Sequence, residues 1–131
     1  MPPSPSITEA EWHVIKILWD HPAQWLPAAR IVEPVARDRR IHHRTARTLL
    51  ARLVKKGAVE SRPEDKGSGH LYRAKISRDT AVRKESRSFL SRVFDGHAAP
   101  ALVHLLAESR DRLSPDQLQE LRNILDGKEK P

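Results

Sequence analysis

The chain has 131 residues, enough for one compact domain or for a small domain with an appended segment. It contains no cysteine, which excludes a disulfide framework and a thiolate metal site, and no apolar run reaches the roughly 20 residues that a membrane-spanning helix needs. Its net charge of +7 is uneven. Residues 1–76 hold 14 Lys/Arg against 8 Asp/Glu, a balance of +6, whereas residues 77–131 hold 10 against 9, a balance of +1. This asymmetry is typical of a polyanion-binding module joined to a nearly neutral segment that binds a partner.

The segment SITEAEWHVIKILWDHP predicts a first helix with a well-defined start. Thr8 is a favourable N-cap, Glu11 three residues later completes a capping box, and Ile7 is placed to act as a hydrophobic staple. Pro22 is expected to end the helix. The apolar residues that recur at helical spacing are Trp12, Ile15, Leu18 and Trp19.

The next segment predicts a short extended piece, QWLP, and then a second helix over AARIVEPVARDRR. Ile31, Val32 and Val35 would face inward. Pro34 lies among them, and a proline beyond the first turn of a helix removes a hydrogen bond, so we expect it to kink or shorten this helix.

A basic and strongly amphipathic third helix is predicted for HHRTARTLLARLVKK, with Gly57 as its stop signal. At about 100° per residue, one side collects the apolar positions, which must face the domain. No acidic residue occurs from Ile41 to Val59, so nothing on this helix would repel phosphates. The inward side is Ala46, Leu49, Leu50, Leu53 and Val54, and the outward side is Arg44, Thr48, Ala51, Arg52 and Lys55, with Thr45 and Arg47 on the flanks.

Two strand-like pieces follow, Ala58–Arg62 and His70–Ile76, separated by a loop rich in Gly, Ser and Pro. They predict a hairpin with a long tip, which could contact the DNA backbone as a wing. The order of three helices and a hairpin predicts a mainly α fold with a winged helix-turn-helix DNA-binding domain over residues 1–76.

Residues 77–131 predict a helical dimerisation domain. Three short amphipathic helices are expected here, the last with Ser114 as N-cap and Pro115 at its first position. Short helices of this kind cannot easily bury their apolar faces alone, which favours packing against a second copy. The predicted dimerisation residues are Phe89, Leu90, Val93, Phe94, Leu102, Leu105, Leu106, Leu118, Leu121 and Leu125.

The candidate DNA contacts lie on the basic helix and on the wing. Arginine can bind a guanine edge or phosphates, and threonine can donate to a phosphate or touch a thymine methyl group. The predicted DNA-binding residues are His43, Arg44, Thr45, Arg47, Thr48, Arg52, Lys55, Lys56, Arg62 and Lys66. We assign base reading and adjacent phosphates to the arginines and threonines of the helix, and phosphate anchoring to the lysines.

Other residue types give weaker signals. The seven histidines show no paired ligand spacing, so no metal site and no cofactor are predicted. The tryptophans Trp12, Trp19 and Trp25 are expected in the core, although stacking on single-stranded bases is the alternative. No catalytic constellation has supporting context, so we do not expect an enzyme.

Three stretches resemble the penicillinase repressor (BlaI/MecI) family of transcriptional regulators: ITEAEWHVIKILWD, RTARTLLARLVKKGAVE, and SFLSRVFDG followed by LSPDQLQELRNIL. The resemblance extends over residues 7–126. It implies a cytoplasmic homodimer that represses transcription at a palindromic operator of double-stranded DNA. It also implies release by a sensor-linked protease, with the cleavage position near Leu105–Leu106, where the characterised repressors have an Asn–Phe pair. A membrane location is not implied.

Two rival hypotheses remain open. A winged helix can also bind structured RNA or a protein partner, because a fold does not determine a function. Alternatively, the repressor could respond directly to a small ligand bound among its C-terminal helices.

Overall fold

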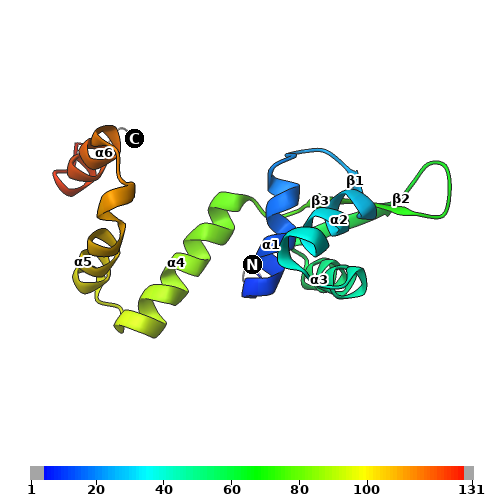
Figure 1. Cartoon of the computed structure of the whole chain (residues 1–131), viewed down its shortest axis with the longest axis horizontal. Coiled ribbons are helices and arrows are strands. Elements are labelled where there is room, and N and C mark those ends of the chain that lie inside the picture. Colours follow the sequence, from blue (N-terminus) through cyan, green and yellow to red (C-terminus); the bar gives the residue numbers. More distant parts are fainter. Residues whose placement is uncertain (1–4, 129–131) are drawn as a thin grey trace. The chain divides into compact units, whose positions relative to one another are not determined.

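A computed structural model describes residues 5–128 of the chain (Figure 1). It contains the three helices, the hairpin and the three further helices in the predicted order. The winged helix-turn-helix is therefore confirmed. The elements are α1 (Glu9–Trp19), β1 (Leu26–Pro27), α2 (Ala28–Arg39), α3 (His43–Lys56), β2 (Val59–Pro63), β3 (His70–Ala74), α4 (Arg78–Phe94), α5 (Ala98–Ser109), a short 3₁₀ turn (Arg110–Arg112) and α6 (Pro115–Leu125).

The capping signals of the sequence are realised at two helix starts. At α1, the backbone N–H of Glu11 donates to Thr8 Oγ1 at 3.3 Å, and the N–H of Thr8 donates to Glu11 Oε1 at 2.9 Å. At α6, Ser114 and Gln117 form the same reciprocal pair, at 3.1 and 2.8 Å. Both boxes satisfy backbone donors that a helix start leaves without partners.

Pro34 does not shorten α2, contrary to one of the two expectations for it. The helix continues for five residues beyond the proline to Arg39, and its C-cap, Arg40, has a left-handed φ of 54°. A proline at this position deprives the carbonyl of Arg30, four residues earlier, of its helical partner. Arg30 is exposed, so water can reach that carbonyl.

The sheet has three antiparallel strands in the order β1-β3-β2. The hairpin pairs Val59 with Ala74 and Pro63 with His70, and β1 adds to the other edge of β3 by pairing Leu26 with Tyr72. The sequence predicted the hairpin and an extended QWLP piece, but not that this piece joins the sheet. Figure 1 shows the loop between β2 and β3 projecting away from α1, α2 and α3.

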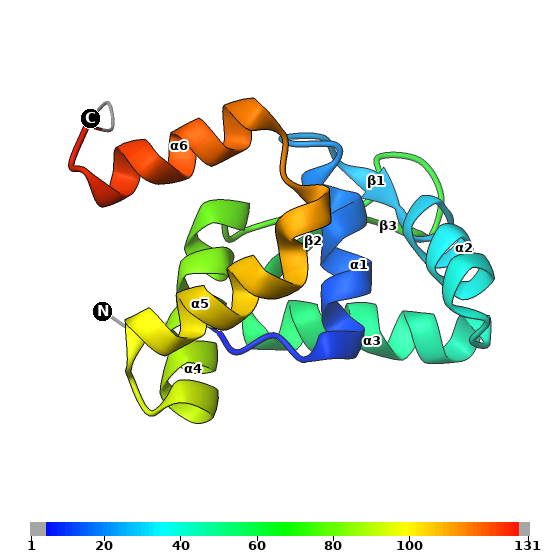
Figure 2. The same ribbon diagram turned by 60° about the vertical axis from the view of Figure 1, so that its left-hand side comes forward.

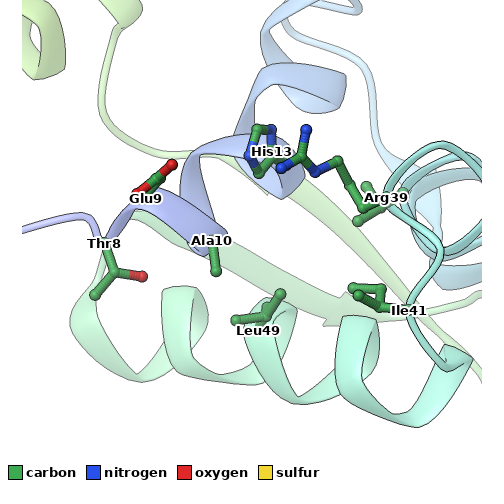
Figure 3. Close-up of a pocket in the computed structure, with 8 residues that line it drawn as sticks. Thr8, Glu9, Ala10, His13, Arg39, Ile41 and Leu49 are labelled. Carbon is green, nitrogen blue, oxygen red and sulfur yellow. The ribbon is translucent and has the colours of Figure 1, made fainter.

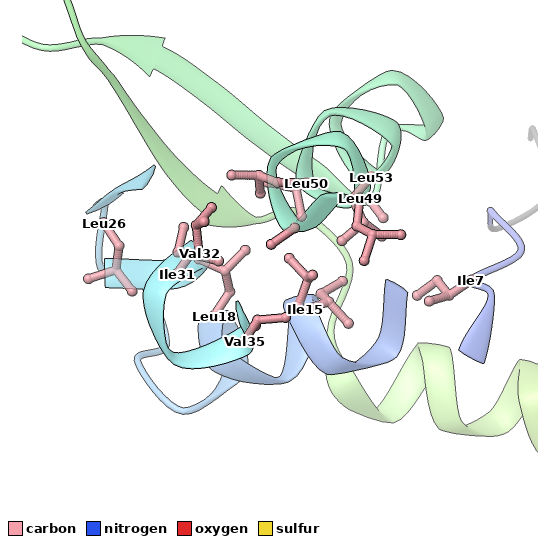
Figure 4. Packing of buried hydrophobic residues seen from close by; sticks show 14 of the residues in the cluster. Ile7, Ile15, Leu18, Leu26, Ile31, Val32, Val35, Leu49, Leu50 and Leu53 are labelled. Carbon is pink, nitrogen blue, oxygen red and sulfur yellow. The ribbon is translucent and has the colours of Figure 1, made fainter. Parts of the chain in front are cut away.

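The core lies among α1, α2, α3 and the inner face of the sheet. Leu49, Leu50 and Leu53 of α3 point toward α1 and α2, as Figure 4 shows. Figure 2 views the same helices from another side. Ile15, Ile31 and Leu53 have no exposed surface. The inward positions predicted for α2 and α3 are thus confirmed, with Val54 only half-buried.

The chain divides into two compact units, Met1–Arg87 and Ser88–Pro131, so α4 begins in the first and ends in the second. Ala81, near the start of α4, belongs to the core of the first unit. Ala101 is the one buried hydrophobic residue among the described residues of the second unit. Within residues 5–128, no helix is both long and apolar enough to cross a membrane.

Candidate nucleic-acid interface

The basic helix α3 is capped at both ends by residues next to it in the sequence. His42 is its N-cap, and the backbone N–H of Arg44 donates to His42 Nδ1 at 2.9 Å. At the other end Gly57 has φ of 84°, and its N–H bonds the carbonyls of Leu53 and Val54. Glycine is favoured there because other residues are strained at positive φ. The buried leucines attach the helix to the domain along its length.

The outward face of α3 is cationic and open. Eight of the candidate DNA contacts predicted from the sequence lie on α3, on its outward side or its flanks, and all eight are exposed, with no carboxylate on the helix. The exposed residues of α3 are His43, Arg44, Thr45, Arg47, Thr48, Ala51, Arg52, Lys55 and Lys56.

Thr48 is only partly available for contacts. Its hydroxyl donates to the carbonyl of Arg44 at 3.0 Å, four residues earlier in the same helix. The hydroxyl proton is therefore engaged, while the oxygen lone pairs and the methyl group stay accessible. Of the two predicted contacts of Thr48, an apolar contact with a thymine methyl group suits this arrangement better than donation to a phosphate.

Lys56 has partners within the domain. Its ammonium lies 2.5 Å from Glu11 Oε1 and donates to the carbonyl of Ser6 at 3.0 Å. Glu11 is 1% exposed, so this ion pair ties the C-terminal end of α3 to the capping box of α1. Burial raises the pKa of the Glu11 carboxyl, but hydrogen bonds from Lys56 and from the Thr8 backbone outweigh it and hold the pKa below its ordinary value. The phosphate-anchoring role of Lys56 stays an untested prediction, and the structure provides a structural role for the same ammonium.

The wing carries the other candidate contacts. Its loop is closed by a hydrogen bond of 2.9 Å from the backbone N–H of Glu64 to the carbonyl of Gly69. Lys66 is exposed at the tip of this loop, and Arg62 is exposed on β2, just before it. Lys66 and Arg62 therefore lie on a different element from α3, where they can reach a different part of a long ligand.

Trp25 lies against a candidate site residue, Arg62, which the sequence interpretation did not foresee. The core placement is confirmed for Trp12 and Trp19, which pack against the core. It is wrong for Trp25, whose ring lies 4.6 Å from the guanidinium carbon of Arg62 and 4.4 Å from that of Arg73. The available signal was alternation, because a buried Leu26 in a strand directs its neighbour Trp25 to the opposite face.

The predicted dimerisation residues divide into two groups. Phe89, Leu90, Phe94, Leu106 and Leu121 are half-buried, and Phe89 packs edge-on against Phe94 with ring centroids 5.7 Å apart. The second group is exposed to solvent in the single chain, although large apolar side chains are usually buried. The exposed members are Val93 (53%), Leu102 (49%), Leu105 (50%), Leu118 (38%) and Leu125 (72%).

A cavity of about 430 Å³ opens between α1, α2 and α3 (Figure 3). His13 and Arg39 lie next to each other at this cavity, above an apolar floor that includes Ile41 and Leu49. Burial, followed by the positive charges of Arg39 and Lys16, lowers the pKa of His13. None of the predicted site residues lines the cavity, so it does not belong to the cationic face of α3.

Comparison with known proteins identifies the family. The family described as penicillinase repressor matches residues 7–127. The methicillin resistance regulatory protein MecI of Mammaliicoccus sciuri is 34% identical over 122 residues, which cover 93% of this chain and 94% of that protein. The penicillinase repressor of Bacillus licheniformis is 29% identical over 122 residues, covering 93% and 91%. The solved DNA-binding domain of the repressor BlaI has a TM-score of 0.51 at 26% identity, covering 61% of this chain and 93% of that domain. The chain belongs to the penicillinase repressor family.

Proposed function

We propose that the chain is a sequence-specific DNA-binding transcriptional repressor that acts as a homodimer on a palindromic operator. The observation that carries the proposal is the outward face of α3, which is cationic, free of carboxylates and held by a continuous buried leucine face. A helix of this kind fits the DNA major groove, where arginine side chains can bind guanine edges and phosphates.

The residues of α3 and of the wing would have different roles. Arg44, Arg47 and Arg52 would read bases and bind adjacent phosphates, with His43, Thr45 and Thr48 beside them. Lys55 on α3, and Lys66 on the wing, would anchor phosphates. Phosphate contacts position a protein on DNA, whereas contacts to base edges select the sequence.

Dimerisation would come from the exposed apolar residues of the second unit. A palindromic operator requires two α3 helices about 34–36 Å apart, one for each half-site, which a two-fold symmetric dimer supplies. The large apolar side chains left exposed on α5 and α6 support this proposal, because a second copy would remove them from water.

Release of the repressor by a sensor-linked protease is a further part of the proposal. Leu105 and Leu106 lie inside α5, so a protease that needs an extended segment would require local unwinding of this helix. Mass spectrometry of the chain from induced and uninduced cells tests this step. A fragment that ends at Leu105 would support it, and derepression with an intact chain would contradict it.

Fluorescence anisotropy on duplexes tiled across the chain's own promoter and neighbouring promoters tests the central proposal, at several salt concentrations and against excess random DNA. We expect one tile to survive competition with two chains bound. Arg47→Ala should cost about 1–3 kcal/mol, mostly on that tile, whereas Lys66→Ala should weaken binding to all duplexes alike. Binding of equal strength on every tile would contradict sequence-specific repression, and preference for a folded RNA would favour the RNA-binding alternative.

A further inference from the structure

The outer face of the sheet carries a cluster that joins all three strands. Trp25 directly precedes β1, Arg73 lies on β3, and Glu60 and Arg62 lie on β2. The register pairs Leu26 with Tyr72 and Glu60 with Arg73, which brings Trp25 and Glu60 to opposite sides of Arg73. All four side chains point away from the core, since Leu26 and Val59 on the other face are buried.

The two arginines of this cluster differ in their partners. Arg73 forms an ion pair with Glu60, with Nη2–Oε1 and Nε–Oε1 distances of 2.6 and 2.7 Å. In the part of the chain that the structure describes, Arg62 has no carboxylate within ion-pair distance. Its guanidinium instead makes a cation–π contact with the ring of Trp25. The cluster of two arginines and one glutamate therefore keeps one uncompensated positive charge, and that charge belongs to Arg62.

The contact with Trp25 leaves the hydrogen-bonding edge of Arg62 available. A guanidinium that lies against an aromatic face keeps the N–H donors in its own plane free, and these donors match the geometry of a phosphate. The stack also restricts a long side chain that would otherwise sample many rotamers, so less conformational entropy is lost when it binds. The Arg73–Glu60 pair in turn holds a second guanidinium against the same ring.

We infer that Trp25 is a positioning residue for DNA binding. It holds the guanidinium of Arg62 in the orientation that binds a backbone phosphate beside the half-site read by α3. The inference rests on the proposed function and adds a residue that makes no contact with DNA. With guanidinium groups already against its ring, Trp25 is not free to stack on a base.

A double-mutant cycle on the full chain tests the inference. It measures the binding constants of each variant for two duplexes, the one selected by the tiling experiment and a random one. Arg62→Ala should weaken both duplexes and reduce the salt slope of log K by about 0.9, since one phosphate contact is lost. Trp25→Leu should weaken both duplexes about two- to fivefold, the range expected for an exposed cation–π contact, with an unchanged salt slope. The double variant should bind like Arg62→Ala alone, because Trp25 acts through Arg62.

Two conservative variants keep the test independent of folding defects at position 25. Arg62→Lys preserves the charge but loses the planar guanidinium that lies over the ring of Trp25, so it should weaken binding as Trp25→Leu does and keep the salt slope. Trp25→Tyr retains an aromatic face and should stay within about twofold of the wild type. The matched control is Arg37→Ala on α2, an exposed arginine that is ion-paired with Asp38 and lies outside the proposed interface.

The outcomes separate this inference from the proposed function. If the effects of Trp25→Leu and Arg62→Ala multiply, or if Arg62→Lys binds like the wild type, Trp25 does not position Arg62 and the inference is wrong while DNA binding stands. If the wild-type chain selects no duplex, the proposed function fails, and the inference fails with it.

Discussion

The two units of this chain bury their apolar residues to very different degrees. In the first unit, α1, α2, α3 and the sheet enclose Ile15, Ile31 and Leu53 completely. In the second unit, Leu102, Leu105 and Leu125 remain between 49% and 72% exposed, although α5 and α6 are well formed and α6 has a full capping box. Local signals are thus sufficient to form helices in both units, while only the first unit completes a core within one chain. The second unit leaves large apolar side chains in contact with water, and this surface supports the proposed homodimer.

The largest effect is expected in the core of the first unit. Leu53→Ala should lower the free energy of unfolding by about 2–5 kcal/mol, because it removes a fully buried side chain and leaves a cavity. Urea unfolding followed by tryptophan fluorescence, at one chain concentration, measures the loss. Leu125→Ala on α6, where the side chain is 72% exposed, is the matched control and should leave this transition within about 0.5 kcal/mol. Equal losses of unfolding free energy in the two variants would contradict the conclusion that only the first unit has a core within one chain.

The ion pair between α1 and α3 should give the next largest effect. Lys56→Met leaves the buried Glu11 carboxylate without its cation and should cost about 1–3 kcal/mol at neutral pH. Lys55→Met, an exposed neighbour on the same helix, is the control. Because the pKa of Glu11 lies below its ordinary 4.5, the stabilisation is complete above that pH and is lost as the pH falls through the lowered pKa. The stability difference between Lys56→Met and the wild type should therefore narrow in acid, and a constant difference would argue against the ion pair as its source.

The exposed apolar surface of the second unit is tested by placing a charge on α6. Leu118→Asp should raise the dimer dissociation constant at least about tenfold, roughly 1.4 kcal/mol, because a carboxylate would be buried in an apolar interface. Gln119→Asp adds the same charge one residue further on and should have a smaller effect. Sedimentation equilibrium measures both constants. A dimer that tolerates Leu118→Asp as well as Gln119→Asp would place the interface away from Leu118.

The smallest effect is expected at the start of α3. His42→Ala removes the acceptor for the Arg44 N–H and should cost about 1 kcal/mol of stability. His42→Asn supplies another favourable N-cap and should restore most of it. Thermal unfolding of the three proteins at one pH and one concentration measures the order. If His42→Ala were as stable as the wild type, the cap would contribute nothing to α3.

Local sequence patterns determined much of this protein. Thr8 with Glu11, and Ser114 with Gln117, predicted helix starts that the structure contains, because a capping box needs only residues three apart. The periodic leucines of α3 separated its buried face from its exposed cationic face in the same way. The order of helices and hairpin was enough to predict the winged fold.

Contacts between distant segments were decided only by the tertiary structure. Lys56 pairs with Glu11 across 45 positions of the sequence, so its place beside the basic face of α3 gave no sign of that partner. Trp25 lies against Arg62 and Arg73 because β1 pairs with β3. β1 has only two residues, so its sequence carries no pattern that predicts this pairing. A proline signal was likewise overridden in α2, where packing of Ile31, Val32 and Val35 on the core maintains the helix through Pro34. In each case the stabilising free energy comes from burial or pairing between different elements. The spacing of residues within one segment therefore does not predict it.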